Sequence, residues 1–251
     1  MPVLYLKTKD FHFDSDQLIQ QGRNLHQQYI SASPYPHIIL DNFLPPKVAQ
    51  RVLKDFPGPD CPHYQQPDNA NQVNKLGRLQ DQYFKGVPDR LRNLLYEFNA
   101  KTFIDFLEAL TGIEAIIPDP HYHGGALHLM LPGGKLDLHA DYNKDVRTGL
   151  DRRINVLFYV NENWQEEYGG YLELWDKDLS QCHQRIAPIL NRCVIFNTTS
   201  ETFHGHPHPL SCPEGMARKS LAFYYYTNGR PEAEQNGEHN TVWKQAPELD
   251  A

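Results

Sequence analysis

One segment in the second half of the chain reads Lys135-Leu136-Asp137-Leu138-His139-Ala140-Asp141. It belongs to a series of short β-like runs separated by turns. Residues two apart on a strand point to the same face, so the imidazole of His139 and the carboxylate of Asp141 can converge on one ion. The segment therefore predicts a strand that carries a candidate metal site.

The His-x-Asp pair is weak evidence by itself, because the chain contains two of them. The other is His12-Phe13-Asp14, where Asp14 is better explained as the N-cap of a helix over residues 17–30. Histidine is also abundant, at 13 residues, and imidazole serves both as a metal ligand and as a general base. The context downstream of His139 has to decide between the two pairs.

That context contains further histidines and a basic residue on a late strand. Three histidines, His204, His206 and His208, follow a predicted strand over residues 193–197, and the segment Arg218-Lys219-Ser220 comes later. Two imidazoles and one carboxylate form the triad that leaves open positions on non-haem Fe(II). An arginine can hold the carboxylate of a dicarboxylate co-substrate through its planar fork. By strand alternation, Ser220, Tyr224 and Tyr226 share the face of Arg218.

The two halves of the chain differ in their predicted secondary structure. The first half is mainly helical, with helices expected over residues 17–30 and 46–56, a short strand over residues 36–41, and an amphipathic helical pattern over residues 91–110. Residues 57–75 are rich in Pro, Asp, Asn and Gln and predict a loop, either a solvated connector or a lid. Short strands are expected at residues 126–131, 135–140, 154–160, 170–175, 185–190, 193–197, 202–206 and 220–227. Pro132-Gly133-Gly134 is the predicted turn between the first two strands, and the spacing predicts a sandwich, jelly roll or barrel.

Composition argues against several classes of protein. With 24 Lys and Arg against 31 Asp and Glu, the net charge of −7 disfavours a nucleic-acid partner. Nothing approaches the run of about 18 apolar residues that a membrane helix needs, and the start MPVLYLKTKD lacks the features of a signal peptide. We therefore expect no membrane partner and a cytoplasmic location. The four scattered cysteines, Cys61, Cys182, Cys193 and Cys212, favour neither a disulfide framework nor a zinc knuckle.

The order of motifs from about His128 to Pro231 resembles a known family. The matching pieces are Leu131-Pro132-Gly133-Gly134, His139-Ala140-Asp141, Tyr159-Val160-Asn161-Glu162-Asn163-Trp164, Gly169-Gly170-Tyr171-Leu172-Glu173-Leu174-Trp175, His204, and Arg218-x-Ser220. They resemble the core of the Fe(II)/2-oxoglutarate-dependent oxygenases, in the prolyl-4-hydroxylase-like branch. The resemblance implies an α+β fold with a double-stranded β-helix (jelly-roll) core supported by N-terminal helices. One oxygenase domain would span residues 1–251, with a helical support region over 1–117, the jelly-roll core over 118–231 and a C-terminal tail over 232–251.

The resemblance also implies roles for individual residues. His139, Asp141 and His204 correspond to the Fe(II) ligands, and Arg218 corresponds to the residue that binds the C5 carboxylate of 2-oxoglutarate. Tyr159 matches a position whose hydroxyl donates to the same carboxylate, and Ser220 could assist. Two alternatives stay open: His206 or His208 as the distal ligand in place of His204, and the adjacent Lys219 as the carboxylate clamp, because many relatives use lysine there.

The activity that the resemblance implies is hydroxylation of an unactivated C–H bond, with 2-oxoglutarate and O₂ as co-substrates and succinate and CO₂ as co-products. The substrate would be an amino acid, a peptidyl proline or another small molecule. Two alternatives of different class remain at this point. The chain could be a non-catalytic jelly-roll binding module, or a cupin-like metal enzyme that does not use 2-oxoglutarate.

Overall fold

The computed structural model describes residues 12–65, 70–77 and 86–247. Its helices are α1 (Ser15–Ile30), α2 (Pro46–Asp55), α3 (Asp89–Phe98) and α4 (Lys101–Thr111), with short 3₁₀ turns at Glu166–Tyr168 and Glu232–Glu234. Its strands are β1 (His37–Leu40), β2 (Gln72–Gly77), β3 (Ile117–Pro118), β4 (Ala126–Ala140), β5 (Asp151–Tyr159), β6 (Leu172–Trp175), β7 (Cys182–Ile186), β8 (Arg192–Asn197), β9 (Phe203–His206), β10 (Arg218–Thr227) and β11 (Val242–Lys244). Within the described residues, none of the helices has the length and apolar character needed to span a bilayer.

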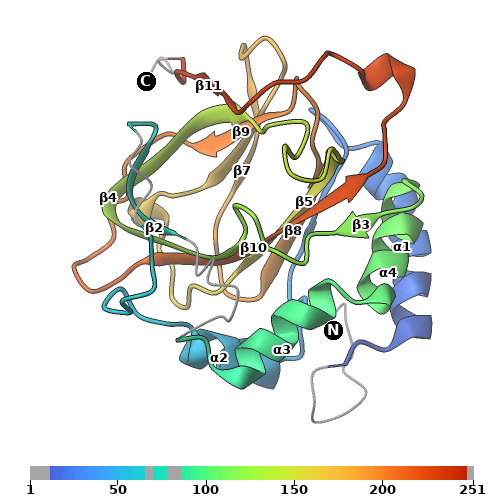
Figure 1. Cartoon of the computed structure of the whole chain (residues 1–251). Helices are drawn as coiled ribbons and strands as arrows, with labels where there is room; N and C mark the ends of the chain where they lie inside the picture. The colour runs from blue at the N-terminus through green and yellow to red at the C-terminus, as the bar shows by residue number, and fades with distance from the viewer. Residues whose placement is uncertain (1–11, 66–69, 78–85, 248–251) are drawn as a thin grey trace.

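The strands form one antiparallel sheet that curls into two facing layers (Figure 1). The strand order is β1-β8-β5-β10-β4-β9-β6-β7, while β2 and β11 also pair with β4 and β3 pairs with β10. Side chains of β5 and β8, such as Tyr159 and Phe196, pack against Leu172, Leu174 and Ile186 of β6 and β7. This packing closes the interior between the layers, and the fold is the double-stranded β-helix expected from the sequence.

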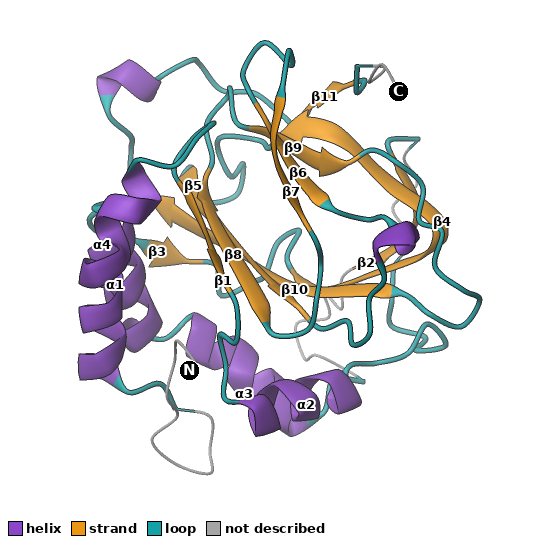
Figure 2. Cartoon of the chain, turned by 180° about the vertical axis from the view of Figure 1, so that it is seen from behind, coloured by secondary structure: helices purple, strands orange, loops and turns teal. Residues whose placement is uncertain are grey.

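Strand β5 shows how the sequence sorts the two sides of the sheet. Ile154, Val156 and Phe158 join the large apolar core beneath the helices, whereas Leu157 and Tyr159 face the other layer. The side chains therefore alternate as a strand requires. Figure 2 shows the helices gathered along the outer side of β1, β8, β5 and β10.

Aromatic residues of the helices fill the contact with this outer face. The ring of Phe98 in α3 stacks on Phe223 of β10, with centroids 4.3 Å apart. The ring of Phe103 in α4 lies 4.8 Å from Phe98. Helices α1 and α4 approach closely at Gly22. A Cβ added at this position would lie 2.8 Å from the carbonyl oxygen of Phe106. The helical layer is thus fixed to the sheet by a continuous aromatic core.

Strand β4 differs from the sequence-based prediction, which divided it at Pro132-Gly133-Gly134. The strand continues through this segment, although its partners change from β10 at residues 126–130 to β9 at residues 136–139. Gly133 has a φ of +74°, and a Cβ on Gly134 would lie 2.6 Å from the Met130 side chain. The glycines therefore bend one strand from the first layer into the second, where a turn was expected.

The bounds of several other elements also differ from those predicted, because pairing with distant strands overrides the local sequence pattern. The periodic segment over residues 91–110 is two helices, broken at Asn99 and Ala100, where the apolar spacing from Phe98 to Phe103 is five. Strand β7 lies at Cys182–Ile186 rather than at 185–190, because Pro188 cannot donate to a ladder. Strand β2 occupies the end of the predicted loop over 57–75, of which 66–69 lie outside the described residues. Strand β11 lies in the predicted C-terminal tail and pairs with β4.

Truncation of Phe98 tests the contact between helices and sheet. Phe98 is fully buried, so Phe98→Ala should lower the free energy of unfolding by about 3–5 kcal/mol. Urea unfolding followed by circular dichroism measures the loss. Arg90→Ala, at an exposed position of the same helix, should change stability by less than about 0.5 kcal/mol. Equal effects of the two substitutions would contradict this account of the core.

Candidate metal centre

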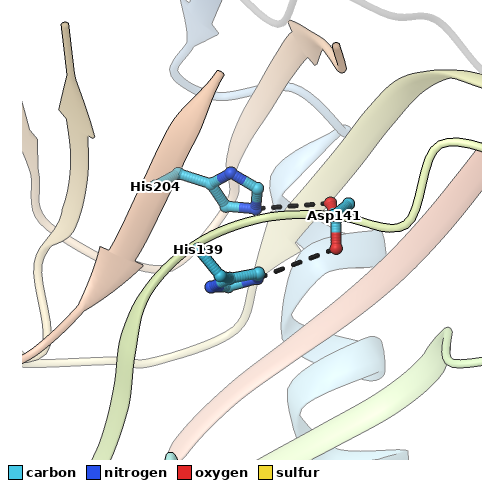
Figure 3. A group of neighbouring side chains, drawn as sticks. All are labelled: His139, Asp141 and His204. Atoms are coloured by element: carbon cyan, nitrogen blue, oxygen red, sulfur yellow. Dashed lines mark ion pairs between the residues drawn. The ribbon is translucent and has the colours of Figure 1, made fainter. Parts of the chain in front are cut away.

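Three potential metal ligands converge at the end of β4 (Figure 3). His139 of β4 lies directly opposite His204 of β9 in the strand register, and Asp141 follows the last residue of β4. The Nε2 atoms of His139 and His204 lie 3.7 Å and 3.4 Å from the two carboxylate oxygens of Asp141. One ligand atom from each of the three buried side chains lies within 4.8 Å of the others. This spacing allows the three side chains to share a single ion.

Hydrogen bonds to the backbone orient both imidazoles. Nδ1 of His139 lies 2.9 Å from the carbonyl oxygen of Asp137, and Nδ1 of His204 lies 3.1 Å from that of Thr202. Because a carbonyl oxygen only accepts, Nδ1 of each neutral ring donates and the lone pair is left on Nε2. Both Nε2 atoms point toward Asp141. Backbone contacts of this kind fix the tautomer of metal-binding histidines.

The protonation states match a site for a cation. Burial, with the neighbouring His204, lowers the pKa of His139 to about 3, and burial also lowers the pKa of His204. Burial raises the pKa of Asp141, but Arg152, the two imidazoles and the hydrogen bond from Asn155 outweigh it and leave the pKa below its usual value. At pH 7 the set is therefore two neutral imidazoles and one carboxylate. This donor set fits a divalent transition-metal ion such as Fe(II).

A second feature of the site is the guanidinium of Arg218 at the start of β10. Arg218 is only 7 % exposed, and its Nε donates to the carbonyl oxygen of Gly170 at 2.7 Å. Its Nη2 donates to the Tyr159 hydroxyl at 3.2 Å. Among the described residues no carboxylate lies within 4.0 Å of Arg218. A buried cation without an anionic partner is costly, so this position favours an anionic ligand.

One cavity of about 270 Å³ joins the two features. His139, Asp141 and His204 line it together with Arg218 and Ser220. His128 and Tyr224 also contribute to its wall. Tyr159 is fully buried and contacts Arg218 without being part of the lining. The structure thus brings the six residues singled out from the sequence to one site, with Tyr159 in a supporting position.

The positions of the side chains discriminate between the alternatives that the sequence left open for the distal metal ligand and for the residue that binds the carboxylate. His206 lines the same cavity and is buried, but it is not part of the three-residue ligand group. His208 is exposed. Lys219 projects to the other face of β10, where its Nζ lies 5.9 Å from the ring of Phe56. These positions favour His204 over the other histidines and Arg218 over Lys219.

The competing His-x-Asp pair has structural partners instead. His12 Nδ1 lies 2.8 Å from a carboxylate oxygen of Glu97. Asp14 caps α1, because its Oδ1 accepts a hydrogen bond from the Gln17 amide at 3.3 Å. The helix-cap interpretation of this pair is therefore confirmed.

Among the residues of the site that sequence reasoning missed, Arg152, Asn155 and Trp243 contact the candidate ligands directly. Asn155 shares the face of Tyr159, so strand alternation could have found it. Arg152 is three residues from Asn155 and would point the other way, but a β-bulge shifts the register between β5 and β10 there. Trp243 of β11 pairs with His139, and their rings lie 4.8 Å apart. Nothing local in the sequence marks that long-range pairing.

Comparisons with known proteins agree with this geometry. The model of a family described as the 2OG-Fe(II) oxygenase superfamily matches residues 125–244. A prolyl hydroxylase from Trichoplax adhaerens, in complex with a peptide fragment of the hypoxia inducible factor oxygen degradation domain, is similar with a TM-score of 0.56 and 18 % identity; the match covers 84 % of this chain and 91 % of that one. For a Pseudomonas putida prolyl-4-hydroxylase the TM-score is 0.51 at 19 % identity, over 83 % and 100 % of the two chains. For HygX of Streptomyces hygroscopicus, with nickel, 2-oxoglutarate and hygromycin B bound, it is 0.52 at 8 % identity, over 87 % and 96 %. At these identities the likeness concerns the fold, and two of these three neighbours are prolyl hydroxylases, the branch expected from the sequence.

The lowered histidine pKa values predict acid sensitivity of the metal-free protein. Between the ordinary pKa of 6.5 and the folded value of about 3, His139 takes up a proton only on unfolding. The free energy of unfolding should therefore fall as the pH drops below 6.5, by up to about 1.4 kcal/mol per pH unit for this residue. Denaturant unfolding between pH 7 and 5 measures the slope. His139→Gln should reduce this dependence of the free energy of unfolding on pH, whereas the control His208→Gln, at an exposed position, should leave it unchanged. The same pH dependence in the wild-type protein and both variants would contradict the prediction.

Proposed function

We propose that the chain, whose residues 125–244 match the model of the 2OG-Fe(II) oxygenase superfamily, hydroxylates an unactivated C–H bond in a reaction dependent on Fe(II) and 2-oxoglutarate. Bound Fe(II) would supply the redox chemistry that couples O₂ and 2-oxoglutarate to hydroxylation, with succinate and CO₂ as co-products. The remaining roles fall to residues of this chain. They bind the ion and orient the co-substrate.

His139, Asp141 and His204 would hold the ion. Their convergence from β4, the residue after it, and β9 supports this assignment. The two Nε2 lone pairs and the carboxylate provide three donor atoms, and such a triad leaves further positions on Fe(II) open for co-substrates. The backbone bonds on Nδ1 keep both rings oriented before any ion binds.

The observation that carries the proposal is the buried Arg218, which lines the cavity that contains the triad and has no carboxylate partner among the described residues. A dicarboxylate whose one end reaches the ion can place its other carboxylate at this guanidinium, where charge-assisted hydrogen bonds are strong. Tyr159 would hold the guanidinium through its hydroxyl and aromatic ring. Ser220, buried beside the cavity, would assist from the same strand.

The same observation weighs against the two alternative functions. A degenerate binding module would have no need for a complete and preoriented ligand group. A cupin-like enzyme that does not use 2-oxoglutarate would leave Arg218 buried without an anion. For the substrate we retain an amino acid, a peptidyl proline or another small molecule; the Trichoplax neighbour holds a peptide and HygX holds hygromycin B.

We also propose a cytoplasmic location. Cys61, Cys182, Cys193 and Cys212 are all free thiols, and cysteines stay reduced in the cytosol. Cell fractionation with an antibody against the native protein tests this proposal, and recovery in an oxidising compartment would overturn it.

Uncoupled turnover tests the proposed activity. The purified protein with Fe(II), 2-oxoglutarate and O₂ should release succinate, and Asp141→Ala should lower the rate by at least about 100-fold because the ion loses the carboxylate of the triad. Under anaerobic conditions Fe(II) and 2-oxoglutarate should give a visible charge-transfer band that His139→Ala abolishes. Succinate release that persists in Asp141→Ala, or a wild-type protein that releases none, would contradict the proposal.

Substitution of Arg218 tests the co-substrate site separately. Arg218→Gln should raise the KM for 2-oxoglutarate by roughly 10- to 150-fold, which corresponds to the loss of about 1.5–3 kcal/mol from hydrogen bonds to a charged group. Arg185→Gln removes an exposed arginine outside the cavity and should leave the KM unchanged. A normal KM in Arg218→Gln would assign the carboxylate to another residue.

A further inference from the structure

We propose that Arg152 is a positioning residue for the metal-binding carboxylate. It holds one oxygen of Asp141, together with Asn155, so that the other oxygen faces the ion. This inference rests on the proposed function, because it takes Asp141 to be a metal ligand. It assigns a role to the most deeply buried cation of the cavity wall.

The contacts converge on the Oδ2 atom of Asp141. Arg152 Nη2 lies 2.9 Å from Oδ2, and Asn155 Nδ2 donates to the same oxygen at 2.8 Å. Arg152 also donates to Asn155 Oδ1, from Nε at 3.1 Å and from Nη2 at 2.8 Å. Arg152 and Asn155 are each only 2 % exposed. The three side chains therefore form a closed triangle in which each fixes the other two.

The second oxygen of Asp141 is left for the ion. Oδ1 lies 3.7 Å from His139 Nε2, and in the described part of the chain no hydrogen-bond donor to Oδ1 is found. Oδ2 lies 3.4 Å from His204 Nε2, but it already accepts from Arg152 and Asn155, so Oδ1 is the oxygen that is left to bind an ion. A carboxylate that binds through Oδ1 alone would take one position on the ion and leave others open for co-substrates.

Two tyrosines hold the guanidinium itself in place. The Arg152 Cζ lies 3.6 Å from the ring centroid of Tyr224 and 4.7 Å from that of Tyr142. Tyr224 is anchored by its hydroxyl to the Gly124 carbonyl oxygen at 2.9 Å, and the Tyr142 hydroxyl lies 2.7 Å from that of Tyr226. A planar guanidinium suits this aromatic setting, and an ammonium does not provide the same fork.

The electrostatics explain why a cation is tolerated there. A buried arginine needs a nearby anion, and Asp141 is the only carboxylate within 4.0 Å of Arg152 in the described residues. The pair holds the carboxylate in place before the ion arrives. Outer contacts of this kind change metal affinity by about 10- to 100-fold when they are removed.

Binding of Co(II) to the metal-free full-length chain tests the inference without turnover. Arg152→Gln should weaken Co(II) binding by about 10- to 100-fold and alter the visible absorption spectrum of the Co(II) complex, because the carboxylate can then turn. Arg152→Lys keeps the charge but not the fork, so it should recover part of the affinity without restoring the spectrum. Arg153→Gln is the matched control: Arg153 is the next residue, also buried, and pairs with Glu234 at 3.3 Å. It should retain wild-type affinity and spectrum.

An unchanged affinity and spectrum in a folded Arg152→Gln protein would overturn the inference. If circular dichroism shows that this variant does not fold, Asn155→Ala undergoes the same test, since it removes a neutral donor to the same oxygen; an unchanged Co(II) spectrum there overturns the inference equally. A wild-type protein that binds no Co(II) would instead overturn the proposed function, so the two failures are distinguishable.

Discussion

The pairing of β4 with β9 is the interaction on which both the fold and the site depend. Strand β4 pairs with β10 through its first half and with β9 through its second half, so it belongs to both layers of the jelly roll. The register with β9 sets His139 opposite His204. A slip by one residue would turn one of these imidazoles to the other face of its strand. The same pairing of β4 with β9 therefore closes the fold and brings the ligands together.

The sheet can place polar groups in its interior because its outer face supplies the stability. Ile154, Val156 and Phe158 bury their side chains beneath the helices, while Asn155, on the same strand, faces Asp141. The cost of burying polar and charged groups in the cavity is offset by the aromatic contacts on the far side of the strand. Residues that look unrelated to the site, such as Phe98, thus keep its strands in register.

The sequence allowed much of this arrangement to be predicted where local patterns and tertiary structure agree. His139, Asp141, Arg218 and Ser220 follow strand alternation, and the order of motifs placed them in one family fold. Prediction failed where pairing partners are distant or alternation is interrupted. Nothing near Trp243 signals that it pairs with a residue about one hundred positions earlier, and the bulge in β5 reverses the direction of Arg152. Such features are set by the whole sheet.

The two buried arginines of the cavity, Arg152 and Arg218, have different roles because their charged surroundings differ. Both line the same space, yet Arg152 has a protein carboxylate at 2.9 Å, whereas the partners of Arg218 in the described part of the chain are the Gly170 carbonyl oxygen and the hydroxyl and ring of Tyr159. A paired cation fixes the geometry of its partner and adds little net charge. A cation without a carboxylate leaves an unbalanced charge that an incoming anion can neutralise. Residue type alone does not distinguish these roles; the difference is that the strands place the carboxylate of Asp141 beside Arg152.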